Sequence, residues 1–209
     1  MNTVTFEPVL PDGIPDAREF ILQYFYPFEP MNRAYINGKE PAQEDVEFTV
    51  AYLKQGLGIR AVDGSGRIIG LSLEYIGEES DVHAMLDEAK EQKWADVLQF
   101  LAYVQQEANV PEKYEAPYEI QMVAVHPDYQ GRSIARELVK RQIELAKRRG
   151  FVAVYVDCSS VFTAKIMKKL GFECIHKIAL ADYRNKEGLQ IFQPDNEIHT
   201  EMQSFFKTI

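Results

Sequence analysis

The segment that decides the fold is Gln121-Met122-Val123-Ala124-Val125-His126-Pro127-Asp128-Tyr129-Gln130-Gly131-Arg132-Ser133-Ile134-Ala135. Its pattern predicts a strand that ends at Pro127, a short polar turn, and a helix that begins with small residues. A helix N-terminus presents unpaired N–H groups and a partial positive charge, which suits an anion such as pyrophosphate. Gly131, Ser133 and Ala135 lack bulky side chains, so a phosphate can approach the backbone. The residues alone leave an ordinary solvated helix start equally open.

Two common nucleotide-binding loops are excluded here. No Gly-Lys-Ser/Thr follows, so the segment is not a Walker loop, and its one glycine makes it no dinucleotide fingerprint. The helix predicted over 131–149 is nevertheless basic, with a net charge of +5 from Arg132, Arg136, Lys140, Arg141, Lys147, Arg148, Arg149, Glu137 and Glu144. A basic helix favours a phosphate-bearing ligand, although a solvated helix face has the same composition.

Helices and strands alternate along the rest of the chain, which predicts an α/β fold with one core in a single domain over 1–209. We expect strands at Val4–Val9, Leu57–Val62, Arg67–Ile76, Tyr118–Val125, Phe151–Val156, Phe172–Leu180 and Ile198–Phe206. We expect helices over 14–28, 41–56, 131–149 and 161–170, and a helical insert over about 80–108. Pro27 and Pro30 are expected to end the first helix.

Composition narrows the function classes. The net charge of −9 disfavours binding to nucleic acid, which relies on basic surfaces. No apolar run is long enough to cross a membrane, and the start lacks the pattern of a signal peptide, so a cytoplasmic protein is expected. Cys158 and Cys174 form no disulfide framework, and no metal site is predicted. Cys158 beside the helix at 161–170 is read as a small buried residue rather than a nucleophile.

Residues 125–135 resemble the acyl-CoA signature of the GNAT superfamily, Gln/Arg-x-x-Gly-x-Gly/Ala. Gln130 and Ala135 match its ends, whereas Ser133 replaces the central glycine. Serine keeps a small side chain and a backbone N–H, so we expect the anion site to survive if its φ is not positive. A second stretch, from Ser160 to Phe172, is similar to the family's Asn-x-x-Ala-x-x-x-Tyr-x-x-Leu-Gly-Phe helix.

The resemblance implies the GNAT fold, in which a mixed central sheet is splayed between two parallel strands and flanked by helices. It also implies acetyl-CoA as co-substrate, with pantetheine between these two strands. The cofactor-binding residues that it implies are Val123, Ala124, Val125, Gln130, Gly131, Arg132, Ser133, Ile134, Ala135 and Ser160. The N–H near Val125 would stabilise the negative charge that develops on the thioester oxygen.

Three stretches resemble the arylalkylamine N-acetyltransferases of insects. They are Phe28-Glu29-Pro30-Met31-Asn32, the run from Asp157 to Ala164, and a tail with Ala181-Asp182-Tyr183 and His199. The helical insert also fits. The resemblance implies Glu29 as the base that deprotonates the amine, with Ser159 and Thr163 assisting near the CoA sulfur. Two alternatives stay open: Glu29 is a solvated loop acid, and Ser159 or Ser160 caps a helix.

The leading hypothesis is therefore acetyl transfer to the primary amine of an arylalkylamine of the dopamine, tyramine, tryptamine or serotonin type. A polyamine or agmatine acetyltransferase is the alternative within the fold, and acidic residues beyond Glu29 would favour it. A catalytically silent acyl-CoA-binding module is a third hypothesis, because Met167 stands where many GNAT enzymes have a tyrosine. We expect a monomer or weak dimer that binds neither nucleic acid nor membrane.

The helix start at residues 130–135 generates the first prediction. Ala135→Asp should abolish acetyl-CoA binding, because it adds bulk and a like charge where the phosphates approach. Arg132→Ala should weaken binding only modestly, because the backbone supplies most of the contacts. Calorimetric titration of both variants with acetyl-CoA checks this, and equal effects of the two would contradict it.

Overall fold

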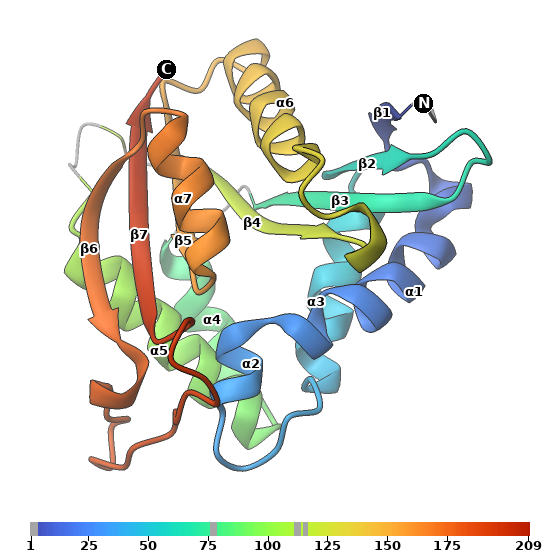
Figure 1. Ribbon diagram of the computed structural model, residues 1–209. Coiled ribbons are helices and arrows are strands. Elements are labelled where there is room, and N and C mark those ends of the chain that lie inside the picture. The colour runs from blue at the N-terminus through green and yellow to red at the C-terminus, as the bar shows by residue number, and fades with distance from the viewer. Residues whose placement is uncertain (1–3, 76–78, 111–113, 115–116) are drawn as a thin grey trace.

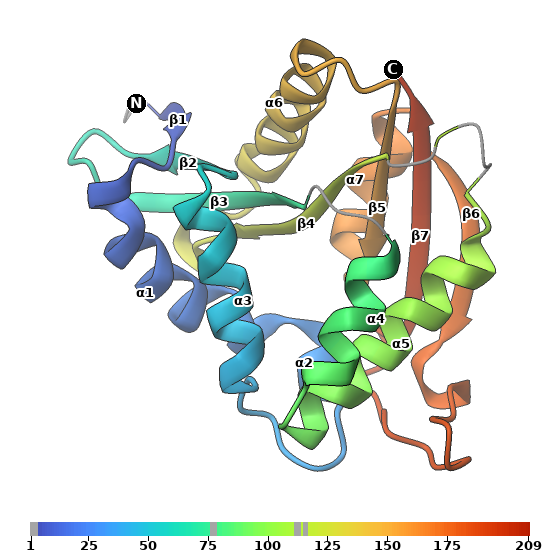
Figure 2. The ribbon, with the colours of Figure 1, turned by 180° about the vertical axis from the view of Figure 1, so that it is seen from behind.

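The computed structural model describes residues 4–75, 79–110, 114 and 117–209. Within these residues, seven strands form one mixed sheet in the order β1-β2-β3-β4-β5-β7-β6. Helices cover both of its faces (Figures 1 and 2). The α/β fold class predicted from the sequence is confirmed. No helix of the described part of the chain is long and apolar enough to cross a membrane.

The N-terminal half of the sheet is antiparallel. Its elements are β1 (Thr5–Pro8), α1 (Ile14–Tyr24), α2 (Pro30–Ala34), α3 (Gln43–Lys54), β2 (Gly58–Val62), β3 (Ile68–Tyr75) and β4 (Tyr118–Val125). A 3₁₀ turn over Tyr26–Phe28 leads from α1 to α2. Between β3 and β4 lies the helical insert, which consists of α4 (Glu79–Glu88) and α5 (Gln92–Ala108).

The C-terminal half contains α6 (Ile134–Arg148), β5 (Ala153–Cys158), α7 (Val161–Lys169), β6 (Glu173–Ala179) and β7 (Glu201–Thr208). A 3₁₀ turn over Pro127–Tyr129 precedes α6, and another over Leu180–Asp182 follows β6. Strand β7 lies between β5 and β6 and is antiparallel to both. A long irregular segment therefore runs from residue 183 to residue 200 before the chain enters the sheet again.

The parallel pair β4–β5 joins the two halves. Tyr118 pairs with Val154 and Glu119 pairs with Tyr155, and beyond these residues the strands diverge. Figure 1 shows the opening between β4 and β5, with α2 lying below it. The expectation of a sheet splayed between two parallel strands is confirmed.

Each face of the sheet has its own core. Helix α6 packs on β2, β3 and β4 through buried residues such as Ile134 and Leu138. On the opposite face, α1 and α3 pack on β3 and β4. Helix α7 packs on β5 and β7, and α5 covers the other side of β7 and β6. Strand β3 is buried over almost its whole length because helices cover both of its faces.

Several predicted boundaries differ from the structure. Pro30 does not end a helix but begins α2, since proline suits the first turn, where its missing N–H leaves no bond unmade. Helix α6 begins at Ile134 rather than at residue 131, because positive φ angles at Gly131 and Ser133 interrupt the helix. Strand β7 begins at Glu201 rather than at Ile198. Ile76, the predicted end of β3, lies outside the described residues.

Gly70 on β3 lies close to the first turns of α6. A Cβ added there would lie 2.9 Å from Cγ2 of Ile134 and 3.2 Å from Cδ1 of Leu138. We expect Gly70→Ala to cost about 1–3 kcal/mol of stability by overpacking. Because Ile134 is the first residue of α6, acetyl-CoA affinity should fall as well. Thermal melting and calorimetric titration check both effects. An unchanged melting temperature and an unchanged Kd for acetyl-CoA would show that α6 can shift without loss of stability or affinity.

Candidate active site

Glu29 is the N-cap of α2. Its buried carboxylate accepts a hydrogen bond from the N–H of Met31 at 3.0 Å and another from the N–H of Asn32. The sequence left open the alternative that Glu29 is a solvated acid in a loop. Because the side chain is buried, the structure excludes this alternative. The two amide donors stabilise the carboxylate and fix its orientation.

Ser159 contacts Glu29 from the other half of the molecule. Its hydroxyl donates a hydrogen bond of 2.6 Å to Oε1 of Glu29, across 130 residues of sequence. Ser159 follows β5 directly, at the end of the strand that diverges from β4. The predicted base and the first predicted hydroxyl are therefore in direct contact.

Burial raises the pKa of the Glu29 carboxyl, while hydrogen bonds from Ser159, Asn32 and Met31 and the charge of Lys93 oppose that rise. A glutamate with a raised pKa is a stronger base than an exposed one, which suits proton abstraction near neutral pH.

Asp45 on α3 is a second carboxyl close to Glu29. Burial raises its pKa to about 7, and the charge of Glu29 adds to the rise. Its Oδ1 lies 3.5 Å from the Thr49 hydroxyl, which in turn lies 3.2 Å from the hydroxyl of Tyr26. Glu44 and Glu47 lie on the same helix, and the spacing of these acidic residues alone does not predict that Asp45 is the one near Glu29.

The N-terminus of α7 uses two different acceptors. Ser160 is the N-cap and accepts from the N–H of Phe162 at 3.2 Å, whereas Nδ1 of His199 accepts from the N–H of Val161 at 3.3 Å. Ser160, not Ser159, is therefore the cap. Thr163 is half-buried in the first turn of α7, and Met167 is fully buried beneath the helix.

Two residues of the predicted anion site have positive φ angles, as is typical of a glycine-rich turn. Gly131 has φ +75° and Ser133 has φ +64°, so both adopt the left-handed conformation. The condition that the sequence analysis set for the serine, a φ that is not positive, is therefore not met. The serine reproduces the conformation that glycine adopts freely, at a cost of roughly 1–2 kcal/mol. Gln130, Arg132 and Ser133 are exposed, so the turn is open to a ligand.

The first turn of α6 completes the predicted phosphate site. Ile134 is buried, Ala135 is half-buried, and the N–H of Glu137 begins the helical hydrogen bonds by binding the carbonyl of Ser133. The guanidinium of Arg132 lies 4.9 Å from the ring centre of Tyr129 and donates to the carbonyl of Asp128. The residues present thus fit a pyrophosphate held mainly by backbone N–H groups.

The backbone of β4 is oriented differently at alternate residues. The N–H of His126 binds the carbonyl of Ile69, the residue before Gly70 on β3, so the groups of Ala124 also face β3. Those of Val123 and Val125 face the opposite side, where β5 diverges. Of the three predicted residues, Val123 and Val125 therefore offer polar groups to a ligand, and Ala124 offers none.

Cys158 is buried, and burial raises the pKa of its thiol, so the structure supports the small buried residue over the nucleophile. Among the described residues, no group of three or more His, Cys, Asp or Glu side chains could hold a metal ion.

The solved structure of the mosquito protein arylalkylamine N-acetyltransferase-like 5b is similar to this structure over almost the whole chain. The sequences are 31% identical, the match covers 99% of this chain and 100% of that one, and the TM-score is 0.94. A family model described as the acetyltransferase (GNAT) family matches residues 82–172. The chain belongs to the GNAT family. GNAT acetyltransferases use acetyl-CoA, and the splayed pair β4–β5 is consistent with that fold.

Two further N-acetyltransferase structures share the fold at lower identity. One is arylalkylamine N-acetyltransferase 2 from Aedes aegypti, with 24% identity, complete coverage of both chains and a TM-score of 0.88. The other is the Drosophila melanogaster polyamine N-acetyltransferase, which catalyses the formation of N-acetylagmatine. It is 24% identical, covers 99% of this chain and 100% of its own, and has a TM-score of 0.89. The matched family region begins after Glu29, so the base candidate lies outside it.

The neighbouring serines generate the next prediction. Ser160→Ala should cost about 1 kcal/mol of stability, because it removes a helix cap, and should leave kcat intact. Ser159→Ala should lower kcat with little change in acetyl-CoA affinity, because its hydroxyl contacts Glu29. Melting curves and steady-state kinetics on both variants distinguish these roles. A normal kcat for Ser159→Ala would remove Ser159 from the active site.

Proposed function

We propose that the protein transfers acetyl from acetyl-CoA to the primary amine of a small arylalkylamine. The observation that carries this proposal is the contact between Glu29 and Ser159 where β4 and β5 diverge. It joins a buried base to a hydroxyl at the place where the family holds the thioester. The likeness to a mosquito arylalkylamine N-acetyltransferase over the full length of both chains supports the choice of acceptor.

In the proposed reaction, different parts of the chain bind acetyl-CoA and deprotonate the amine. Acetyl-CoA supplies an activated acetyl group as a thioester. The turn at 130–135 holds its phosphates, and Val123 and Val125 direct backbone groups toward the opening between the strands. Because an amine with a pKa near 10 is protonated at pH 7, Glu29 removes a proton before nitrogen attacks.

Ser159 connects the two proton transfers. Its hydroxyl donates to Glu29 and so helps to fix the carboxylate that accepts the amine proton. As the carbon–sulfur bond breaks, the Ser159 proton passes to sulfur, and protonated Glu29 restores the hydroxyl. The ammonium nitrogen thus loses two protons. The one that Glu29 removes reaches sulfur through Ser159, and the second leaves the nitrogen of the tetrahedral adduct for solvent as the amide forms, so that the products are the amide, the CoA thiol and one H⁺ and the protein is unchanged. Thr163, in the adjacent turn of α7, is the second hydroxyl that we assign to the leaving group.

A polyamine or agmatine acceptor is the second candidate, and half-buried carboxyls other than Glu29 favour it. Asp45 lies within charge interaction of Glu29. Glu119 and Asp157 form another pair of carboxyls at the parallel junction, where burial raises their pKa values to about 8 and about 6. Carboxyls beyond the base could bind the second cation of a diamine. The exposed ring of Phe28, beside Glu29, instead favours an aromatic acceptor.

Glu29→Gln tests the proposed base while keeping a carbonyl oxygen that can cap α2. We expect kcat to fall by roughly a hundredfold, the usual range for loss of a general base, with acetyl-CoA affinity unchanged. The loss should be smaller for amines of low pKa, which arrive deprotonated. Glu19→Gln, an exposed glutamate on α1, is the matched control. Near-normal turnover by Glu29→Gln on its best amine would refute the assignment.

The pH profile is part of the same test. Since the pKa of Glu29 is raised, kcat/KM should rise with pH along a limb above the usual glutamate range, and Glu29→Gln should lose that limb. Comparing phenethylamines with diamines decides the acceptor class. An absence of thiol release with every amine, despite acetyl-CoA binding, would indicate the silent acyl-CoA-binding module.

A further inference from the structure

Helix α2 cannot hold its own orientation. It has five residues, and so short a helix is not stable without contacts to the rest of the protein. Asn32 provides one set of contacts, since its amide donates to the carbonyls of Tyr26 and Lys39 at 3.0 and 2.7 Å. These bonds hold α2 to the N-terminal half of the protein. Ser159 belongs to the C-terminal half, so contacts with that half must fix the position of α2 relative to Ser159.

The segment 191–199, which we call the strap, provides these contacts. The N–H of Gln193 binds the carbonyl of Ala34 at 2.6 Å, the N–H of Ile36 binds the carbonyl of Ile191 at 3.0 Å, and Tyr35 forms an antiparallel bridge with Phe192. The end of α2 is thus paired with the strap like a short piece of sheet.

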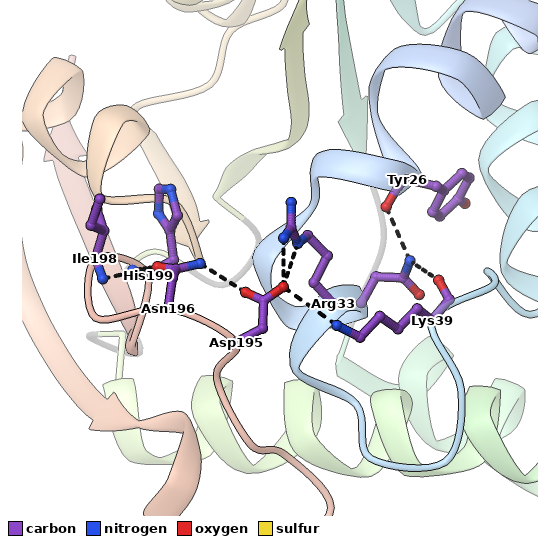
Figure 3. A network of polar contacts seen from close by, with 8 residues as sticks. Tyr26, Arg33, Lys39, Asp195, Asn196, Ile198 and His199 are labelled. Carbon is purple, nitrogen blue, oxygen red and sulfur yellow. Dashed lines mark hydrogen bonds and ion pairs between the residues drawn. The ribbon is translucent and has the colours of Figure 1, made fainter.

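Asp195 adds an ion pair to this pairing. Its Oδ2 accepts from Nε and Nη2 of Arg33 at 2.8 and 2.5 Å, and Nζ of Lys39 lies 3.4 Å away (Figure 3). Arg33 lies in the helix whose first N–H groups hold the Glu29 carboxylate. The guanidinium lowers the pKa of Asp195, so this carboxyl stays charged at neutral pH.

The other end of the strap is attached to α7. The amide of Asn196 donates to Asp195, and its Oδ1 accepts from the N–H groups of Ile198 and His199 at 2.9 and 2.8 Å. His199 in turn accepts from the N–H of Val161. Figure 3 shows the bonds from Arg33 to His199 as a continuous series. The strap therefore connects α2 with the start of α7, which follows Ser159 closely.

We propose that Asp195 is a positioning residue that, through Arg33, keeps the carboxylate of Glu29 within hydrogen-bonding distance of Ser159. This inference rests on the proposed role of Glu29 as base. The Arg33–Asp195 pair is partly exposed, with side chains 40% and 19% accessible, so its contribution to stability is small. Its effect is on geometry, because a displacement of about 1 Å can lower a rate by roughly a hundredfold.

Asp195→Asn tests the proposal, because asparagine keeps the shape and removes the charge. We expect kcat to fall about tenfold, short of the limit for a full displacement, while the Kd for acetyl-CoA stays unchanged. Glu7→Gln is the matched control, since Glu7 accepts from Nε and Nη2 of Arg60 at 2.9 and 2.8 Å in a pair that joins β1 to β2. The control should melt like the test variant and keep its kcat.

A double-mutant cycle separates positioning from a general structural effect. In the Ser159→Ala background the contact with Glu29 no longer exists, so Asp195→Asn should lower kcat by less than about twofold further. Equal losses in both backgrounds, or an unchanged kcat for Asp195→Asn alone, would overturn the proposal.

Two further variants keep the test decisive. Arg33→Lys retains the charge but loses the fork, so it should fold and show a smaller loss of kcat that also disappears in the Ser159→Ala background. A full loss in that background would count against the proposal. If Glu29→Gln keeps its turnover, the proposed function fails. If Glu29→Gln is inactive while Asp195→Asn and Arg33→Lys are normal, only the strap inference fails.

Discussion

The pairing of β4 with β5 through Tyr118 and Glu119 is the constraint on which the site depends. A parallel sheet normally continues its ladder, and here it stops after two residue pairs. The backbone groups of Val123 and Val125 then face an opening instead of a neighbouring strand. Backbone groups that a ligand removes from water need partners, so this part of β4 suits a ligand that is extended and can form hydrogen bonds along its length.

The sequence predicted well those parts of the fold that depend on local pattern. The strand, turn and helix around 121–135 were predictable because the alternation of apolar residues, Pro127 and Gly131 determine the conformation of the residues next to them in the sequence. Helix α2 was missed because five residues are too few to show helical periodicity. Pro30 was read as a stop, although proline also begins helices, and only the surrounding chain decides between the two roles.

The candidate site was predictable only as far as the family resemblance reached. Glu29 and Ser159 were proposed separately, and no local pattern indicates a contact across 130 residues. The adjacent serines could not be distinguished, because either can cap a helix until the start of α7 is known. The strap could not be predicted for the same reason, since Arg33 and Asp195 are 162 residues apart and no local pattern indicates their contact.

The two ends of the opening between β4 and β5 are held by different kinds of bonds. At the closed end, backbone hydrogen bonds pair the strands, and almost any sequence can form these. At the open end, α2 lies below the gap, and its position depends on side chains such as Asn32, Arg33 and Asp195 as well as on backbone bonds to the strap. Side chains change by single substitutions, whereas a backbone ladder does not. The position of α2, and with it the distance between Glu29 and Ser159, can therefore vary during evolution while the pairing of the two strands stays the same.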